Sequence, residues 1–214
     1  MNKNIKLVCT DVDGVIFDIG SSWREFHKRL GTYDLERLEN LRRSYLNGKI
    51  SYLQWAREEV KVWRGIPYSK FEEIIESFPL VLGAQETIEE LDKRGYYLVA
   101  VSSGGLHRVV EKRLKKLGYD EVYSNDLEEI DGIVTGEFIC NVEHHNKHKV
   151  LEEVLKRKSL SWENVVAIGD DITDVTLLRK VGLSIAFCPR DFRLVKAADV
   201  VIQKRDLREV LAFL

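Results

Sequence analysis

The sequence contains few cysteines and prolines and carries almost no net charge. Its three cysteines, Cys9, Cys140 and Cys188, lie far apart and share no metal-ligand spacing. An odd number of cysteines without a Cys-x-x-Cys pair excludes a disulfide-rich scaffold and indicates reduced thiols in a cytoplasmic protein. The net charge is −2, from 33 basic and 35 acidic residues, so the composition predicts neither a nucleic acid nor a membrane as partner.

Long apolar segments, internal repeats and low-complexity tracts are missing as well. The chain reaches Asp11 after only a short apolar run, which is too short for a signal peptide or a membrane span. Hydrophobic residues make up 44% of the 214 positions, which is enough to bury a sizeable core. The length therefore predicts one large domain, or a core domain with a smaller insertion.

Short β-branched runs alternate with amphipathic segments along most of the chain. The runs are continuously apolar, which is typical of strands buried on both faces of a parallel sheet. They predict strands at residues 5–10, 97–102, 164–169, 183–187 and 199–202. Between them, the amphipathic segments predict helices at residues 87–95, 106–118, 147–158 and 173–182. Strands and helices in series predict a doubly wound, mainly parallel α/β sheet.

Residues 20–79 interrupt this alternation, because they contain no good strand. Their amphipathic runs predict helices, and Ser51 with Gln54 has the spacing of a capping box. We therefore predict an all-helical cap inserted into an α/β core, with the core formed by residues 1–18 and 80–214 and the cap by residues 19–79.

A second interruption lies at residues 127–139. There Asp131-Gly132 stands between two β-prone runs, which predicts a β-hairpin.

Polar residues follow several of the predicted strands, at the edge where an open α/β sheet binds its ligands. Asp11 and Asp13 follow the first strand. The other polar positions at strand ends or at the start of a following helix are Ser102, Ser103, Gly104, Gly105, Lys147, Lys149, Asp170, Asp171 and Asp174. If the sheet forms as predicted, all of them point into one crevice.

The chemistry that these residues suggest is phosphoryl transfer. Converging carboxylates need a cation, and hard oxygen ligands select Mg²⁺. Asp11 could attack phosphorus as a nucleophile, while Mg²⁺ holds it beside a phosphate oxygen. Ser103 and the backbone N–H groups of the glycine-rich turn could receive the other phosphate oxygens. A lysine would neutralise the remaining charge, and Asp13 would protonate the leaving alkoxide and then activate water.

The order DVDGV, SSGG, Lys147 and GDDITD resembles the four motifs of the haloacid dehalogenase superfamily, and especially its phosphoserine phosphatase-like branch. The likeness runs from VAVSSGG to the carboxyl terminus and extends, more loosely, to the helical cap that this branch inserts after its first motif. It therefore covers essentially the whole chain. The resemblance implies a Rossmann-like core with an inserted cap, and a Mg²⁺-dependent phosphatase.

The resemblance also implies a role for each motif residue. Asp11 matches the nucleophile and Asp13 the acid/base, whose backbone carbonyl is a metal ligand in the family. Asp170 matches the fourth-motif metal ligand, so the implied metal set is Asp11, Asp13 and Asp170, with Asp174 and Asp171 supporting it. Ser103 matches the second-motif hydroxyl and Lys147 the third-motif lysine, and with Gly104 they would bind the substrate phosphate.

Other interpretations of single residues stay open. Ser102 is an alternative to Ser103, and Lys149 to Lys147, while Asp171 could simply cap the next helix. The two leading aspartates alone could also cap a turn, or belong to a glycosidase. The histidines of residues 144–148 could suggest zinc, but their spacing favours surface residues. Three tryptophans of the predicted cap could line a pocket or form the apolar core of the cap. They are Trp23, Trp55 and Trp63.

Two positions depart from the phosphoserine phosphatase pattern. Where the family has a glutamate for the serine ammonium this chain has Gly20, and where it has an arginine for the serine carboxylate this chain has Glu59. Arg57 could substitute for that arginine, and Thr173 stands where the fourth motif often has asparagine. We therefore predict hydrolysis of a small phosphorylated metabolite other than phosphoserine, through an aspartyl-phosphate.

Three alternatives to that prediction remain. They are transfer of the phosphoryl group to an alcohol, a phosphoserine phosphatase, and a non-catalytic regulatory module that binds metal. The sequence predicts no oligomeric state.

Overall fold

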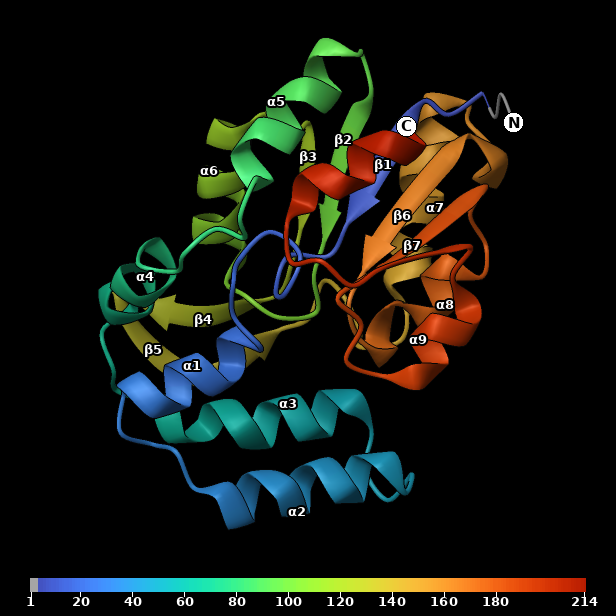
Figure 1. Cartoon of the computed structure of the whole chain (residues 1–214). Helices are drawn as coiled ribbons and strands as arrows, with labels where there is room; N and C mark the ends of the chain where they lie inside the picture. The colour runs from blue at the N-terminus through green and yellow to red at the C-terminus, as the bar shows by residue number, and fades with distance from the viewer. Residues whose placement is uncertain (1–3) are drawn as a thin grey trace.

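The computed structural model describes residues 4–214, and its centre is a six-stranded parallel sheet (Figure 1). The strand order is β3-β2-β1-β6-β7-β8. The strands are β1 Leu7–Thr10, β2 Tyr97–Val101, β3 Glu121–Tyr123, β6 Val165–Gly169, β7 Leu183–Phe187 and β8 Val200–Ile202. The predicted α/β sheet is confirmed, and all five predicted strands are present. β1, the first strand in the chain, lies near the middle of the sheet, so that its carboxyl end is surrounded by neighbouring strands.

Helices cover both faces of the sheet. Alternate residues of β1 point to opposite faces, so Val8 packs into one apolar cluster while Leu7 and Cys9 pack into the other. Cys9 is fully buried there as a small apolar side chain. The helices of the first face are α5 Ala84–Lys93, α6 His107–Leu117 and the 3₁₀ segment η4 Leu207–Phe213, and those of the second are α7 Lys147–Lys158, α8 Val175–Leu178 and α9 Phe192–Ala197.

The segment between β1 and α5 is helical, as predicted. Its elements are α1 Ser22–Arg29, α2 Leu35–Leu46, α3 Tyr52–Val60, the 3₁₀ turn η1 Lys61–Trp63 and α4 Tyr68–Glu76. The capping box of Ser51 and Gln54 is present at the start of α3. In Figure 1 α1, α2 and α3 lie beyond the carboxyl ends of the core strands, while α4 lies to one side, next to the strands β4 and β5.

The predicted hairpin is present as β4 Asp126–Ile130 and β5 Ile133–Ile139, joined at a turn with positive φ at Asp131 and Gly132. It packs against the helical cap rather than against the parallel sheet. The Gly65 N–H donates to the carbonyl of Val134 (2.9 Å), and the Tyr68 N–H donates to the carbonyl of Gly132 (2.8 Å). The hairpin is thus distant in sequence from the cap helices but next to them in space (Figure 1).

The division into a core of residues 1–18 and 80–214 and a cap of residues 19–79 remains a prediction.

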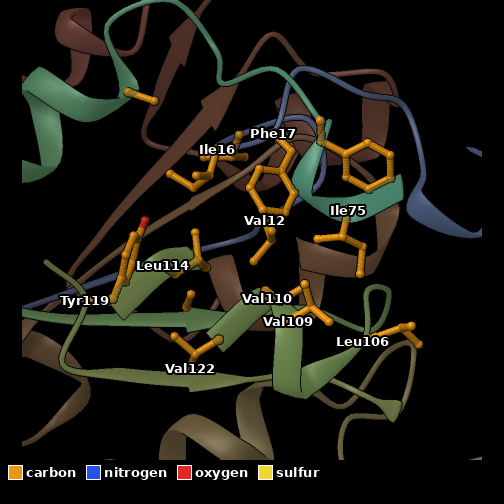
Figure 2. Packing of buried hydrophobic residues seen from close by; sticks show 14 of the residues in the cluster. Val12, Ile16, Phe17, Ile75, Leu106, Val109, Val110, Leu114, Tyr119 and Val122 are labelled. Carbon is orange, nitrogen blue, oxygen red and sulfur yellow. The ribbon is translucent and has the colours of Figure 1, made fainter. Parts of the chain in front are cut away.

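The loop after β1 is fixed by apolar packing. Val12, Ile16 and Phe17 are fully buried and belong to the same cluster as residues of α6 and Ile75 of α4 (Figure 2). The loop also needs Gly14, whose φ is 83° and whose position leaves no room for a side chain. A Cβ there would lie 2.0 Å from Oδ2 of Asp170. The sequence Asp-Val-Asp-Gly therefore brings two strand ends into close contact.

Two local predictions were inexact. The short strand β3 was not predicted, because it has three residues and only the middle one is buried. The predicted helix 173–182 is split into a 3₁₀ turn, η3 Ile172–Asp174, and the short helix α8. The Asp174 carboxylate accepts hydrogen bonds from the backbone of Asp170 and Asp171, and this folds the turn back on the strand end.

Across residues 4–214, no helix combines the length and apolarity needed to cross a membrane.

Candidate active site

A cavity of about 410 Å³ lies between the core and the cap. Its lining from the core comes from loops that follow four of the parallel strands, and the residues include Asp11, Asp13, Ser102, Ser103, Gly104, Asp171 and Arg190. Its lining from the cap comes from α1, α2 and α3 and includes Trp23, Arg24, Arg42, Tyr52, Trp55 and Glu59. Residues from several strand ends thus share one cavity, but not all the predicted positions reach it, since Lys149 is exposed and absent from its lining.

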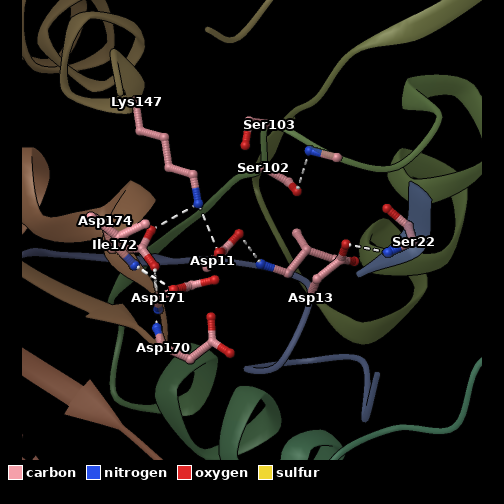
Figure 3. A network of polar contacts seen from close by, with 12 residues as sticks. Asp11, Asp13, Ser22, Ser102, Ser103, Lys147, Asp170, Asp171, Ile172 and Asp174 are labelled. Carbon is pink, nitrogen blue, oxygen red and sulfur yellow. Dashed lines mark hydrogen bonds and ion pairs between the residues drawn. The ribbon is translucent and has the colours of Figure 1, made fainter. Parts of the chain in front are cut away.

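Lys147 is a buried cation in contact with Asp11, at the core end of the cavity. Its side chain is 1% exposed, and its Nζ lies 2.7 Å from Oδ2 of Asp11 and 2.8 Å from Oδ1 of Asp174 (Figure 3). The second oxygen of Asp11 accepts the N–H of Val12 at 2.7 Å. A buried lysine between two carboxylates keeps its charge, and the two aspartates raise its pKa although burial opposes this. Lys147 therefore orients Asp11 directly.

Asp11, Asp170 and Asp174 form a buried cluster that can hold a metal ion. Each offers a carboxylate oxygen, and the three oxygens lie within 4.8 Å of one another. Burial, together with the neighbouring acids, raises the pKa of Asp11 and of Asp170 well above the usual range. Oδ1 of Asp170 is buried without a hydrogen-bond partner among the described residues. Crowded carboxylates with an unsatisfied buried oxygen fit a hard cation.

Asp13 points away from this cluster and toward the cap. Its Oδ2 accepts the backbone N–H of Ser22 at 2.7 Å, and its Oδ1 is buried without a partner among residues 4–214 (Figure 3). The hydroxyl of Ser22 accepts the N–H of Gly105 at 2.8 Å. Burial raises the pKa of Asp13, while the Ser22 bonds lower it. Ser22, the first residue of α1, therefore connects the acid to the glycine-rich turn.

The glycine-rich turn follows β2. The Gly104 N–H donates to Oγ of Ser102 at 3.1 Å, and this hydrogen bond fixes the conformation of the turn. The Ser103 carbonyl accepts from the Tyr52 hydroxyl at 3.1 Å and from Nδ2 of Asn125 at 2.8 Å. Gly104 has no space for a side chain, because a Cβ would lie 2.7 Å from Oγ of Ser22. Both serines line the cavity, and the choice of Ser103 as the phosphate-binding hydroxyl stays a prediction.

The structure also decides between some alternatives left open by the sequence. Lys147 is buried at the site, whereas Lys149 is exposed. His144 is partly buried, because it lines the cavity and stacks on Tyr52 with ring centres 5.6 Å apart. The metal cluster among the described residues includes no histidine.

Asp171 and the cap tryptophans have mixed roles. Asp171 caps the turn η3 and also lies 3.4 Å from Nη2 of Arg190. Trp63 is fully buried in the core of the cap, while Trp23 and Trp55 line the cavity. Both interpretations of the tryptophans thus apply, to different residues.

Three polar residues of the site were not predicted. Arg190 follows β7, and its Nε lies 2.8 Å from Oδ2 of Asp170. The strand-end rule could have identified it, because residues 183–187 were predicted as a strand. Asn125 follows the unpredicted strand β3, and its side chain bonds to Ser103 and to Val142, which links two loops of the site. Ser22 carried no sequence signal, since its role depends on where α1 begins.

Comparisons with known proteins agree with this geometry. Residues 8–179 match the haloacid dehalogenase-like hydrolase family. The phosphoserine phosphatase of Methanocaldococcus jannaschii is 35% identical over 215 residues, which cover 100% of both chains. A solved phospho-aspartyl intermediate analogue of phosphoserine phosphatase has a TM-score of 0.84 at 33% identity, covering 98% of this chain and 99% of the other. A substrate-bound phosphoserine phosphatase complex gives the same TM-score and identity, with 98% of each chain covered.

The prediction of a substrate other than phosphoserine is contradicted by these full-length similarities. It rested mainly on Gly20 and Glu59, with Thr173 as a further departure from the family pattern. Two positions cannot exclude a substrate, because the cavity collects charged side chains from several elements. Arg24 of α1 and Arg42 of α2 line it together with Glu59, so groups of both signs are available without the expected pair.

The motifs, the fold and the similarity over the whole chain therefore agree, and the chain belongs to the haloacid dehalogenase-like hydrolases, as a phosphatase of the phosphoserine phosphatase branch.

Proposed function

We propose that this protein hydrolyses phosphoserine to serine and phosphate, with Mg²⁺ as cofactor and an aspartyl-phosphate on Asp11 as intermediate. The observation that carries the proposal is the position of Asp11. Its buried carboxylate lies at the floor of the cavity, held by Lys147 and beside Asp170. A carboxylate oriented in this way is a nucleophile whose attack needs no rearrangement of the site.

In the first step an oxygen of Asp11 attacks phosphorus, and the bond from phosphorus to the serine oxygen breaks. Ser103, which lines the same cavity as Asp11, receives a phosphate oxygen. Lys147 supports this step as a fixed positive charge, because its ammonium is already positioned 2.7 Å from Asp11. These groups stabilise charge that develops on the phosphoryl oxygens in the transition state.

Asp13 supplies the proton in the first step and removes one in the second. The raised pKa of Asp13 favours its protonated form, which can donate to the leaving serine oxygen. A water molecule then attacks the phosphorus, Asp13 takes a proton from that water, and the bond to Asp11 breaks. The unpartnered Oδ1 of Asp13 is the oxygen available for both transfers.

Asp11 and Asp170 would hold the cation, with Asp174 beside them and the Asp13 carbonyl as the ligand that the family resemblance adds. The all-oxygen ligand set fits Mg²⁺. When bound, the ion supplies electrostatic stabilisation of the phosphoryl oxygens and cancels the repulsion between them and Asp11. Arg190 pairs with Asp170 and also lies 3.4 Å from Oδ2 of Asp171, so it partly neutralises the same group of acids.

The test is phosphate release from a panel of phosphomonoesters with Mg²⁺ and with EDTA. We expect phosphoserine to rank first and the activity to disappear with EDTA. Asp11→Asn removes the nucleophile, so kcat should fall by at least about 10⁴-fold. A different ester at the top of the ranking would contradict the substrate, and an active Asp11→Asn variant would contradict the mechanism.

A further inference from the structure

Asn125 is a buried amide that joins several parts of the site. It follows β3 and is fully buried. Its Nδ2 donates to the carbonyl of Ser103 and to the carbonyl of Val142, both at 2.8 Å. Its Oδ1 accepts the N–H groups of Asn141 at 2.8 Å and of Val142 at 2.7 Å. Both hydrogens and both lone pairs of the amide are therefore used, and this network fixes the orientation of the side chain.

These bonds tie the glycine-rich turn to the loop that leads to Lys147. The turn is held at both ends, because the Asn125 side chain bonds to the Ser103 carbonyl and the Asn125 carbonyl accepts the His107 N–H at 2.7 Å. The loop of residues 141–146 leads directly to Lys147, the first residue of α7. Asn125 thus helps to fix the position of Ser103 relative to Lys147, the two groups that would hold the phosphoryl group.

A residue of the cap completes this network. The hydroxyl of Tyr52, in α3, donates to the Ser103 carbonyl at 3.1 Å and lies 3.2 Å from Nδ2 of Asn125. A carbonyl oxygen has two lone pairs, so it accepts from both groups at once. Burial raises the pKa of Tyr52 well above its ordinary value, so the hydroxyl stays protonated and remains a donor. Through this bond the cap contacts the turn directly.

The ring of Tyr52 is held by aromatic contacts that do not involve its hydroxyl. It stacks on His144 of the loop before α7, with ring centres 5.6 Å apart and ring planes 13° apart. It also packs edge-on against Trp55 and against Phe138 of β5, with ring centres 6.1 and 6.2 Å apart. Loss of the hydroxyl alone should therefore leave the ring in place.

The direction of the Ser103 carbonyl decides where the Ser103 hydroxyl points. The peptide bond from Ser103 to Gly104 is planar, so its orientation is fixed when both of its polar groups are bonded. Its oxygen accepts from Asn125 and Tyr52, and its N–H donates to Oγ of Ser102. Without the two donors to its oxygen, this peptide would be free to rotate, and the hydroxyl would leave the position where it meets the phosphate.

We propose that Asn125 and Tyr52 are positioning residues for phosphate binding, and that the Tyr52 hydroxyl makes the phosphate-binding form of the turn depend on a docked cap. Asn125 keeps the Ser103 hydroxyl and the Lys147 ammonium at matching positions. Tyr52 completes the turn only while α3 lies against the core. The inference rests on the proposed phosphoryl-transfer site but not on phosphoserine as substrate, because all phosphomonoesters share the phosphate.

Tyr52→Phe removes the hydroxyl and keeps the ring. We expect kcat/KM to fall about 5- to 10-fold for every ester of the panel, because the phosphate is held less well and the leaving group is not involved. The Ki of inorganic phosphate as a competitive inhibitor should rise in parallel, and the ranking of the esters should stay the same. A fall confined to esters with one type of leaving group would overturn the inference, since Tyr52 would then contact the leaving group.

Tyr45→Phe is the matched control, because it removes a hydroxyl from the same aromatic cluster. The Tyr45 ring stacks on Trp55 with centres 4.9 Å apart, but Tyr45 is absent from the cavity lining. Its hydroxyl has no hydrogen-bond partner among residues 4–214. This variant should match the wild type in kcat/KM and in the Ki of phosphate.

Ser103→Ala shows whether Tyr52 acts through Ser103. This substitution removes the hydroxyl that the network positions but keeps the carbonyl. In the Ser103→Ala background, Tyr52→Phe should therefore lower kcat/KM less than about twofold. Losses that multiply in the double variant would contradict the inference, because Tyr52 would then act on another group.

Asn125→Asp tests the other positioning residue. Aspartate keeps the shape and the acceptor for the N–H groups of Asn141 and Val142, but it places an oxygen against the carbonyls of Ser103 and Val142. We expect kcat/KM to fall about 100-fold or more for every ester, with a lower midpoint of thermal unfolding. Asn125→Ala, which adds no charge, is the second variant if the first does not fold. Wild-type kcat/KM in a folded variant would overturn the role of Asn125.

The outcomes separate this inference from the proposed function. If another ester ranks above phosphoserine, the proposed substrate fails, and the same comparisons with that ester decide the inference. If the wild type hydrolyses no ester, the proposed function fails, and calorimetric titration with inorganic phosphate and Mg²⁺ decides. Weaker phosphate binding by Tyr52→Phe than by Tyr45→Phe supports the inference, while equal or absent binding contradicts it.

Discussion

The two ends of the cavity are built on different principles. At the core end the charged side chains are held by close neighbours, and Lys147 contacts both Asp11 and Asp174 at less than 3 Å. At the cap end Glu59 forms no ion pair with any residue of the range 4–214, and Arg24 is more than half exposed. The core end is preorganised for one reaction, while the cap end leaves charges available for the part of the substrate that varies.

The surroundings of each end explain this difference. The core residues follow adjacent parallel strands, whose spacing is set by backbone hydrogen bonds, so their side chains have little freedom. The cap residues come from helices α1, α2 and α3. Aromatic rings pack α2 against α3, where the ring centres of Tyr45 and Trp55 are 4.9 Å apart, and α1 against η1, where those of Trp23 and Trp63 are 5.5 Å apart. Such packing holds the helices together but leaves the polar side chains on their other faces free to change conformation.

Lys147→Met tests how far the core end depends on one buried charge. Without Lys147, Asp11 and Asp174 are left as neighbouring buried acids with no cation. We expect a loss of about 3–5 kcal/mol in the free energy of unfolding, measured by urea denaturation without metal, and loss of activity. Lys149→Met, on the exposed side of the same helix, should change neither. An unchanged stability for Lys147→Met would mean that the ion pairs contribute little.

Glu59→Gln tests the opposite property of the cap end. Folding raises the pKa of Glu59 from 4.5 to about 7, so the native carboxylate is destabilising above pH 7 and harmless below pH 4.5, where it is protonated in both states. The glutamine variant should therefore be more stable than the wild type by up to about 3 kcal/mol at pH 8, and the gain should vanish toward pH 4. Thermal unfolding across pH measures it.

The pH dependence can be assigned to Glu59 only if the groups that face it do not titrate over the same pH range. They are Arg24 of α1, Arg37 of α2, and Trp55 and Tyr52 of α3. The arginines stay charged over this range and the indole does not titrate, while burial raises the pKa of the Tyr52 hydroxyl well above its ordinary value. A pH-dependent gain in Glu59→Gln can therefore be assigned to Glu59. A gain that is the same at pH 8 and pH 4 would contradict the raised pKa.

Ser22→Ala tests the contact between the two ends and should have the smallest effect. The variant loses the acceptor for the Gly105 N–H but keeps the backbone N–H that bonds to Asp13. We expect a loss of about 1 kcal/mol in stability and a moderate fall in kcat with little change in KM. Ser21→Ala, one residue earlier, should leave kcat unchanged. A rise in KM with an unchanged kcat would instead place Ser22 in substrate binding.

Most of the core end could be predicted from sequence order. Asp11, Lys147 and Asp170 each follow or begin a recognisable element, and parallel strands bring their carboxyl ends to one edge. The cap end could not be predicted in this way. Whether Arg24 and Glu59 reach the same cavity depends on how α1 and α3 pack, and a one-residue change in helix register turns a side chain by about 100°. The comparison of positions 20 and 59 with a family pattern therefore led to the wrong substrate.

The sequence by itself determined the α/β core, the inserted helices and the set of residues at the strand ends, because these depend on local periodicity and on the fixed geometry of a parallel sheet. Only the tertiary structure decided that the hairpin β4–β5 joins the cap, that Arg190 pairs with Asp170, and that Glu59 remains buried without a cation. These features arise from contacts between segments far apart in the chain, and such contacts leave no periodic signal in the sequence.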